Sequence, residues 1–120
     1  MNNLIDILGA FIEKAWDYLC EIFITVILDT IVSFFSEVVD YFTSMRLEMG
    51  VQIPFMLGEN SPVAEQLSGL KKNSQGGEGI YEGVFNEQTN QLDSIRWIEG
   101  KGLDPKIKDL LKEENIVTFN

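Results

Sequence analysis

The chain of 120 residues has no histidine and a single cysteine. Without histidine it can form neither the Ser-His and Cys-His pairs of common nucleophilic enzymes nor an imidazole metal site. With one cysteine, Cys20, it can form neither an intramolecular disulfide nor a thiolate zinc site. These absences predict a protein that is not an enzyme, and we expect no cofactor and no metal site built from His or Cys.

Cys20 itself lies in a dense apolar run between Leu19 and Glu21. Cysteine in such a run behaves most often as a small buried apolar side chain, so we expect Cys20 to be buried. A reactive or lipidated thiol is the alternative.

Basic side chains are also scarce, with 9 Lys and Arg against 19 Asp and Glu and a formal net charge of −10. Binding to a phosphate backbone requires clustered Lys and Arg. The basic pairs here are only Lys71 with Lys72, and Lys106 with Lys108 on one predicted helix face. We therefore expect no nucleic-acid partner.

Residues 4–47 contain no proline and one glycine, and their apolar residues recur at helical spacing. This pattern predicts one long helix, or two helices joined almost directly, within an N-terminal region of residues 1–57. The many β-branched residues near its middle raise the alternative of a strand. Residues 23–33 mix polar and apolar character at period two, so we predict a helix there.

Polar side chains at intervals of four form one narrow stripe along this predicted helix. Its charged members are Glu13, Asp17, Glu21, Asp29 and Glu37. Three interpretations stay open: the solvated face of a helix buried in an assembly, the lining of a water-filled lumen between several copies, or a Ca²⁺ or Mg²⁺ site. Because the rest of the helix surface is apolar, we expect a homo-oligomer or a subunit of a larger helical complex.

The second half of the chain is more polar and predicts shorter elements. Residues 58–79 contain Ser61 followed by Pro62, which is typical of a helix start. Residues 71–79 follow, and their composition, with three glycines and few apolar side chains, predicts a flexible linker. Residues 80–120 predict a small β-β-α-β module. The predicted fold class is therefore α+β.

Within this module, residues 80–86 and 92–99 predict two strands joined by a four-residue hairpin loop. Asp104 followed by Pro105 predicts the start of a helix, and residues 116–119 predict a short closing strand. A module of this size lies near the lower limit for independent folding, so we expect it to pack on another part of the protein.

The sequence leaves membrane insertion marginal. Over residues 20–38, eleven large apolar side chains contribute roughly −5 kcal/mol, against about +3 kcal/mol for Asp29 near the centre. The start of the chain has no basic region or small-residue cleavage site, so we expect no signal peptide.

Two functions follow from these patterns. We favour a non-enzymatic, membrane-associated protein whose helix inserts as an oligomer, with the acidic stripe turned inward. The Lys/Arg bias, with Arg46 and Lys71 after the apolar centre, then predicts a cytoplasmic C-terminal module. The alternative is a soluble, cytoplasmic interaction or structural subunit whose apolar helix packs against copies of itself or in a larger complex.

Overall fold

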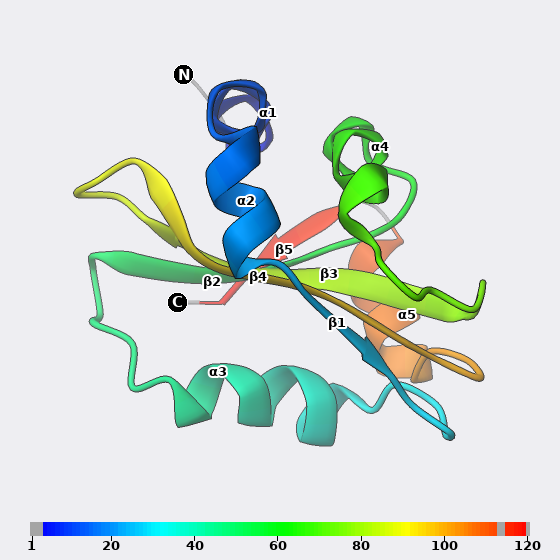
Figure 1. The fold of residues 1–120 in the computed structure, drawn as a ribbon. Coiled ribbons are helices and arrows are strands. Elements are labelled where there is room, and N and C mark those ends of the chain that lie inside the picture. The colour runs from blue at the N-terminus through cyan, green and yellow to red at the C-terminus, as the bar shows by residue number, and fades with distance from the viewer. Residues whose placement is uncertain (1–3, 113–114, 120) are drawn as a thin grey trace.

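The structure, a computed structural model, describes residues 4–112 and 115–119. It has one mixed sheet with helices on both faces, as Figure 1 shows. Two helices, α1 (Leu4–Lys14) and α2 (Trp16–Ile22), precede the strands. The α+β class predicted from the sequence is confirmed.

The sheet has five strands in the order β1-β4-β3-β2-β5. Strand β1 is parallel to β4, and the other neighbouring pairs are antiparallel. The strands are β1 (Ile24–Ile27), β2 (Gln52–Leu57), β3 (Glu78–Asn86), β4 (Gln91–Gly100) and β5 (Ile116–Thr118). The sheet thus joins strands of residues 1–57 with strands of residues 80–120.

Each face of the sheet is covered by a helical layer, so each has its own apolar core. On one face lie α1, α2 and α4 (Pro62–Leu67), which the 3-10 turn η2 (Ser68–Leu70) extends. On the other face lie the π-helix η1 (Phe34–Val39), α3 (Asp40–Ser44) and α5 (Pro105–Leu111). Because of this double cover, β3 is buried from Gly79 to Phe85.

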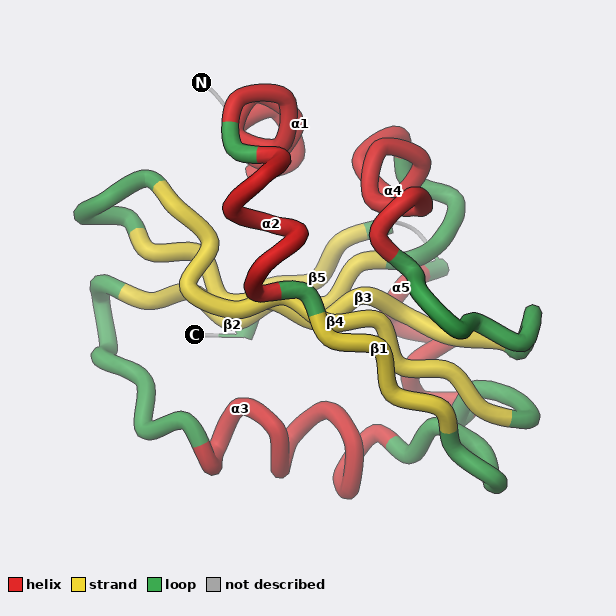
Figure 2. The backbone as a smooth tube through the Cα atoms, in the orientation of Figure 1, coloured by secondary structure: helices red, strands yellow, loops and turns green. Residues whose placement is uncertain are grey.

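The sequence predicted one long helix, or two helices joined almost directly, over residues 4–47. Helices α1 and α2 are two such tandem helices over residues 4–22, but β1 and a loop interrupt the predicted helical stretch after them (Figure 2). Helix α2 ends at Phe23, whose backbone is extended, and the next four residues, Ile24 to Ile27, are all β-branched. Such side chains fit a pleated sheet better than a helix. The hydrogen bonds to β4 then decide between the two alternatives.

The last part of residues 1–57 is not helical either. Helix α3 ends at Ser44, followed by Arg46 in the left-handed conformation (φ 52°). Gly50 also has a positive φ of 83°, and β2 begins two residues later.

The local signals of the second half are confirmed. The Ser61 side chain accepts a hydrogen bond from the Ala64 N–H at the start of α4. The Asp104 side chain does the same for Lys106 at the start of α5. Strands β3 and β4 form the predicted hairpin, and β5 lies where the closing strand was expected.

Two further findings concern the expected burial of Cys20 and the expected membrane insertion. Cys20 is exposed, contrary to expectation, because α2 turns the neighbouring Leu19 into the core and leaves Cys20 on its outer side. Among the described residues the longest helix has 11 residues, and none has the length and hydrophobicity needed to cross a bilayer.

Candidate functional site

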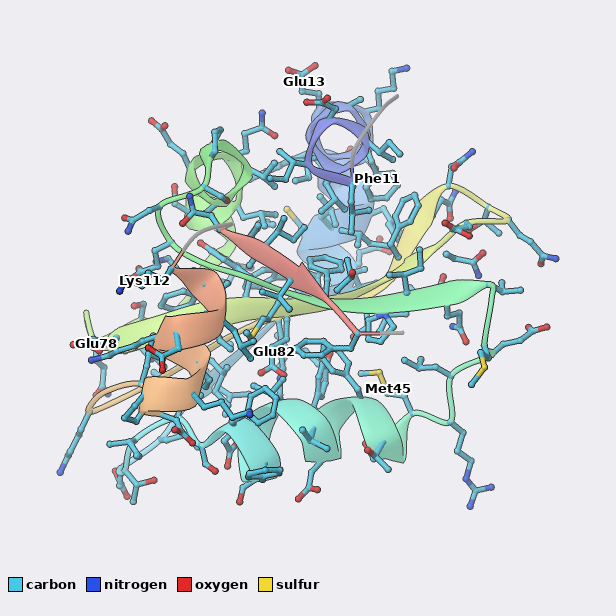
Figure 3. The ribbon with its side chains drawn as sticks, turned by 180° about the vertical axis from the view of Figure 1, so that it is seen from behind. Phe11, Glu13, Met45, Glu78, Glu82 and Lys112 are labelled. Atoms are coloured by element: carbon cyan, nitrogen blue, oxygen red, sulfur yellow. The ribbon has the colours of Figure 1, made fainter. Side chains whose placement is uncertain are left out.

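The five acids of the predicted stripe do not form a stripe in the structure. Glu13 lies on α1, where it points away from the sheet in Figure 3, and Asp17 and Glu21 are exposed on α2. Asp29 lies in the loop after β1. Glu37 lies on η1, which covers the opposite face of the sheet. No single surface of the protein therefore carries all five side chains.

Two other glutamates, Glu82 and Glu99, are buried in the sheet. Glu82 lies between the sheet and the α3 layer (Figure 3), and its Oε1 accepts hydrogen bonds from Arg96 Nη2 at 3.0 Å and Nε at 3.2 Å. The same Nη2 donates to the Glu37 carbonyl at 2.7 Å, and the guanidinium lies 3.6 Å from the centre of the Tyr41 ring. Arg96 thus joins β4 to the helical layer.

The surroundings of Glu82 favour its protonated form. Burial raises the pKa of Glu82 to about 8, and the nearby Arg96 offsets this only in part. The Glu82 Oε2 atom has no hydrogen-bond partner among the described residues. Perturbed carboxyl groups are frequent in active sites. Because the side chain is 0% exposed, however, it cannot touch a substrate in this conformation.

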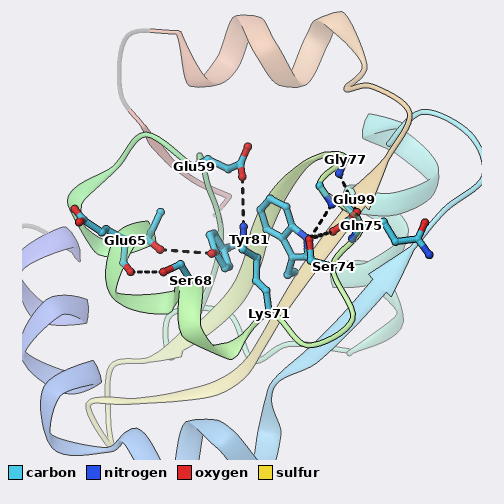
Figure 4. A network of polar contacts seen from close by, with 12 residues as sticks. Glu59, Glu65, Ser68, Lys71, Ser74, Gln75, Gly77, Tyr81 and Glu99 are labelled. Carbon is cyan, nitrogen blue, oxygen red and sulfur yellow. Dashed lines mark hydrogen bonds and ion pairs between the residues drawn. The ribbon is translucent and has the colours of Figure 1, made fainter.

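Glu99 has the opposite electrostatics. Its carboxylate accepts hydrogen bonds from Ser74 Oγ, Trp97 Nε1 and the backbone N–H groups of Gln75 and Gly77, at 2.5 to 3.0 Å (Figure 4). Burial opposes ionisation, but these four donors outweigh it and hold the pKa of Glu99 at about 2. The predicted flexible linker of residues 71–79 is therefore tied to the sheet by Glu99, and its last two residues belong to β3.

A cavity of about 470 Å³ lies beside this network, between α4 and β3. It is lined by hydroxyl groups and carboxylates, including Ser61, Glu59 and Tyr81. The Lys71 ammonium lies 3.9 Å from the centre of the Trp97 ring and 3.4 Å from Glu59 Oε1. Lys71 is itself one of the residues that line this cavity, where its ammonium is paired with Glu59 (Figure 4).

These buried groups were missed by the sequence analysis, although one signal exists. Glu82 is flanked two residues away by Ile80 and Val84, so an acid takes a position on an otherwise apolar strand face. Such a break in alternation indicates a buried partner. The partner, Arg96, becomes visible only through the register of β3 and β4.

Strand β1 lies at one edge of the sheet and, among the described strands, pairs only with β4. The Leu28 N–H donates to the Glu99 carbonyl, so the even-numbered residues here face β4. By the alternation of a strand, the N–H and C=O groups of Thr25 and Ile27 point outward. Within the described residues no hydrogen bond reaches these groups. The β1 edge is therefore open to another strand.

Exposed apolar side chains come from the same part of the chain. Phe35 is 65% exposed, Ile24 57% and Ile31 50%. Of the large apolar side chains that are at least half exposed in the described part of the chain, only Met49 comes from elsewhere. Ile24 is the one of these side chains that lies on β1 itself, and an exposed apolar side chain on an open edge strand is typical of a surface that binds another chain.

Charged side chains lie at both ends of the β1 edge. Asp29 lies in the loop at its C-terminal end, where it lines a cavity with Ile27 and Leu28. Lys72 lies at its N-terminal end, where it lines a cavity of about 150 Å³ with Phe23 and Thr25. Both are exposed, and neither forms an ion pair with another described residue.

The described residues contain no group of three or more His, Cys, Asp or Glu side chains that could hold a metal ion. No known protein family, curated protein or solved structure matches the chain. The functional proposal therefore depends on the geometry of the chain itself.

Proposed function

We propose that the protein is a non-enzymatic interaction protein that assembles by pairing the β1 edge with a strand of another chain. The observation that carries this proposal is the open backbone of Thr25 and Ile27, together with the exposed side chain of Ile24 on the same strand. A paired strand would receive the outward N–H and C=O groups, and its side chains would remove apolar surface from water.

The negative charge of the protein bears on the alternative function, membrane association. The net charge of −10 opposes binding to anionic surfaces. Membrane association, the function favoured from the sequence, depends on a continuous apolar helix through residues 20–38. Strand β1 and the loop after it interrupt that stretch. We therefore favour assembly with another protein chain over insertion into lipid.

The test is the mass of the native protein with the β1 edge blocked. Thr25→Pro removes one outward N–H, while the bonds from residues 24, 26 and 28 to β4 remain, because edge strands tolerate proline where the N–H faces solvent. We expect light scattering to give wild-type protein, purified under native conditions, a mass above the 13.6 kDa of one chain. We expect the Thr25→Pro variant to have the mass of one chain.

Thr25→Val is the matched control, because it keeps the N–H and the β-branched shape, and it should assemble like wild type. Circular dichroism verifies that each variant is folded. A wild-type protein that is monomeric at all concentrations, or a folded Thr25→Pro variant with unchanged mass, would contradict the proposal. Sedimentation with phospholipid vesicles in place of assembly would favour the membrane function.

A further inference from the structure

The open β1 edge can accept a strand of the same sequence. We propose that its partner is the β1 edge of a second copy, antiparallel, with Thr25 opposite Ile27 of that copy and Val26 on the two-fold axis. This inference depends on the proposed function and names the partner. In this register the outward groups of Thr25 and Ile27 meet their counterparts and form about four hydrogen bonds.

The register also covers exposed apolar surface. Ile24, Val26 and Leu28 lie on the sheet face that η1 and α3 cover, since Val26 and Leu28 pack against that core. In the proposed pair, Ile24 of each copy lies opposite Leu28 of the other. The 57% exposed side chain of Ile24 is then covered by an apolar neighbour on the same face.

Charge complementarity favours a second copy in this orientation. An antiparallel pair brings the end of one β1 to the start of the other, so Asp29 lies opposite Phe23 of the second copy. Lys72 lines the cavity beside Phe23. Each Asp29 therefore meets a Lys72 of the other copy, and the symmetry repeats the pair. Both side chains lack an ion-pair partner among the described residues of one copy.

Disulfide trapping tests the register directly. In a Cys20→Ser background, Val26→Cys places two thiols in a non-hydrogen-bonded antiparallel pair with Cα atoms about 4.5 Å apart, which suits a disulfide. Oxidised glutathione should convert most of this variant to a covalent dimer that dithiothreitol reverses.

Ile24→Cys in the same background is the matched control. Its side chain is more exposed than that of Val26, but in this register the two copies of residue 24 lie about 13 Å apart along the pair. It should therefore remain monomeric on non-reducing gels. Equal trapping at both positions, or more at Ile24, would overturn the register.

Charge reversal tests the ion pair without new thiols. Asp29→Lys and Lys72→Glu should each weaken dimerisation roughly tenfold, and the double variant should restore it. High salt should reduce these differences. If the wild type assembles but the double variant is as weak as the single ones and Val26→Cys is not trapped, the inference fails while the proposed function stands. A monomeric wild type contradicts both.

Discussion

At the scale of single residues, the two buried glutamates show how their neighbours set a carboxyl group's charge. Glu99 accepts four hydrogen bonds and is ionised, whereas Glu82 accepts hydrogen bonds from Arg96 alone, and its second oxygen has no partner among the described residues. Both lie in the same sheet and are at most 1% exposed. The number of donors, rather than burial alone, therefore decides which of the two retains its proton.

The raised pKa of Glu82 predicts a loss of stability as the pH rises. A carboxyl group whose folded pKa is about 8 holds its proton after the unfolded chain has lost it, so its contribution is full at low pH and disappears as the pH approaches 8. We expect the unfolding free energy of the wild type to fall by at least about 1 kcal/mol between pH 5 and pH 8.

Glu82→Gln should flatten this profile, because the amide does not ionise. Urea unfolding at pH 5, 6, 7 and 8 measures the effect, with the exposed acid Glu78 replaced by Gln as the control. The chain has no histidine to add a slope in this range, and Glu99, with a pKa of about 2, stays ionised throughout. Parallel profiles for the wild type and Glu82→Gln would show that Glu82 does not titrate in this range.

At the scale of elements, residues 71–77 form an anchored loop. Their composition is that of a flexible tether, but Ser74, Gln75 and Gly77 all donate to the carboxylate of Glu99 on β4. Gly77 also lies so close to β4 that an added Cβ would approach the Gly100 carbonyl to 2.5 Å. The small residues of this loop therefore permit close contact with β4.

Replacing the anchor should release the loop. Glu99→Gln replaces one acceptor oxygen with an amide NH₂ group, which cannot accept the hydrogen bonds that this oxygen receives. We therefore expect the free energy of unfolding to fall by about 2–3 kcal/mol. Trypsin should also cleave after Lys71 or Lys72 several times faster, as followed by mass spectrometry. Ser74→Ala removes one of the four bonds and should have a smaller effect. Unchanged cleavage in Glu99→Gln would mean that other contacts hold the loop.

At the scale of the whole molecule, the sheet connects the first and second halves of the chain. Strand β2 lies between β3 and β5, and β5 pairs with no other strand among those described. Both faces of β3 are covered by helices that come largely from the first 70 residues. The β-β-α-β segment therefore lacks its central neighbour and its cover when it is separated from the rest.

We accordingly expect residues 80–120 alone to be unfolded. The excised segment should give a random-coil circular dichroism spectrum and no cooperative thermal transition, whereas the full chain should unfold in one step. A cooperative transition in the fragment would show that the module folds without β2.

Several features of the protein were determined by the sequence alone, because their causes are local. The helix starts at Ser61 and Asp104 depend on side chains that bond to N–H groups two or three residues away. The β3–β4 hairpin depends on alternation and a short loop. The absence of histidine excludes imidazole chemistry without reference to any fold.

The tertiary structure alone decided the rest. Residues 24–27 combine helical spacing with β-branched side chains, and the choice between helix and strand depends on pairing with residues 96–99, which are distant in the sequence. That strand separates Asp29 from the acids of α2 and places Glu37 on the other face of the sheet. Periodicity reports which side chains share a face of one element, whereas the contacts between elements depend on the free energy of burying surfaces that are remote in the chain.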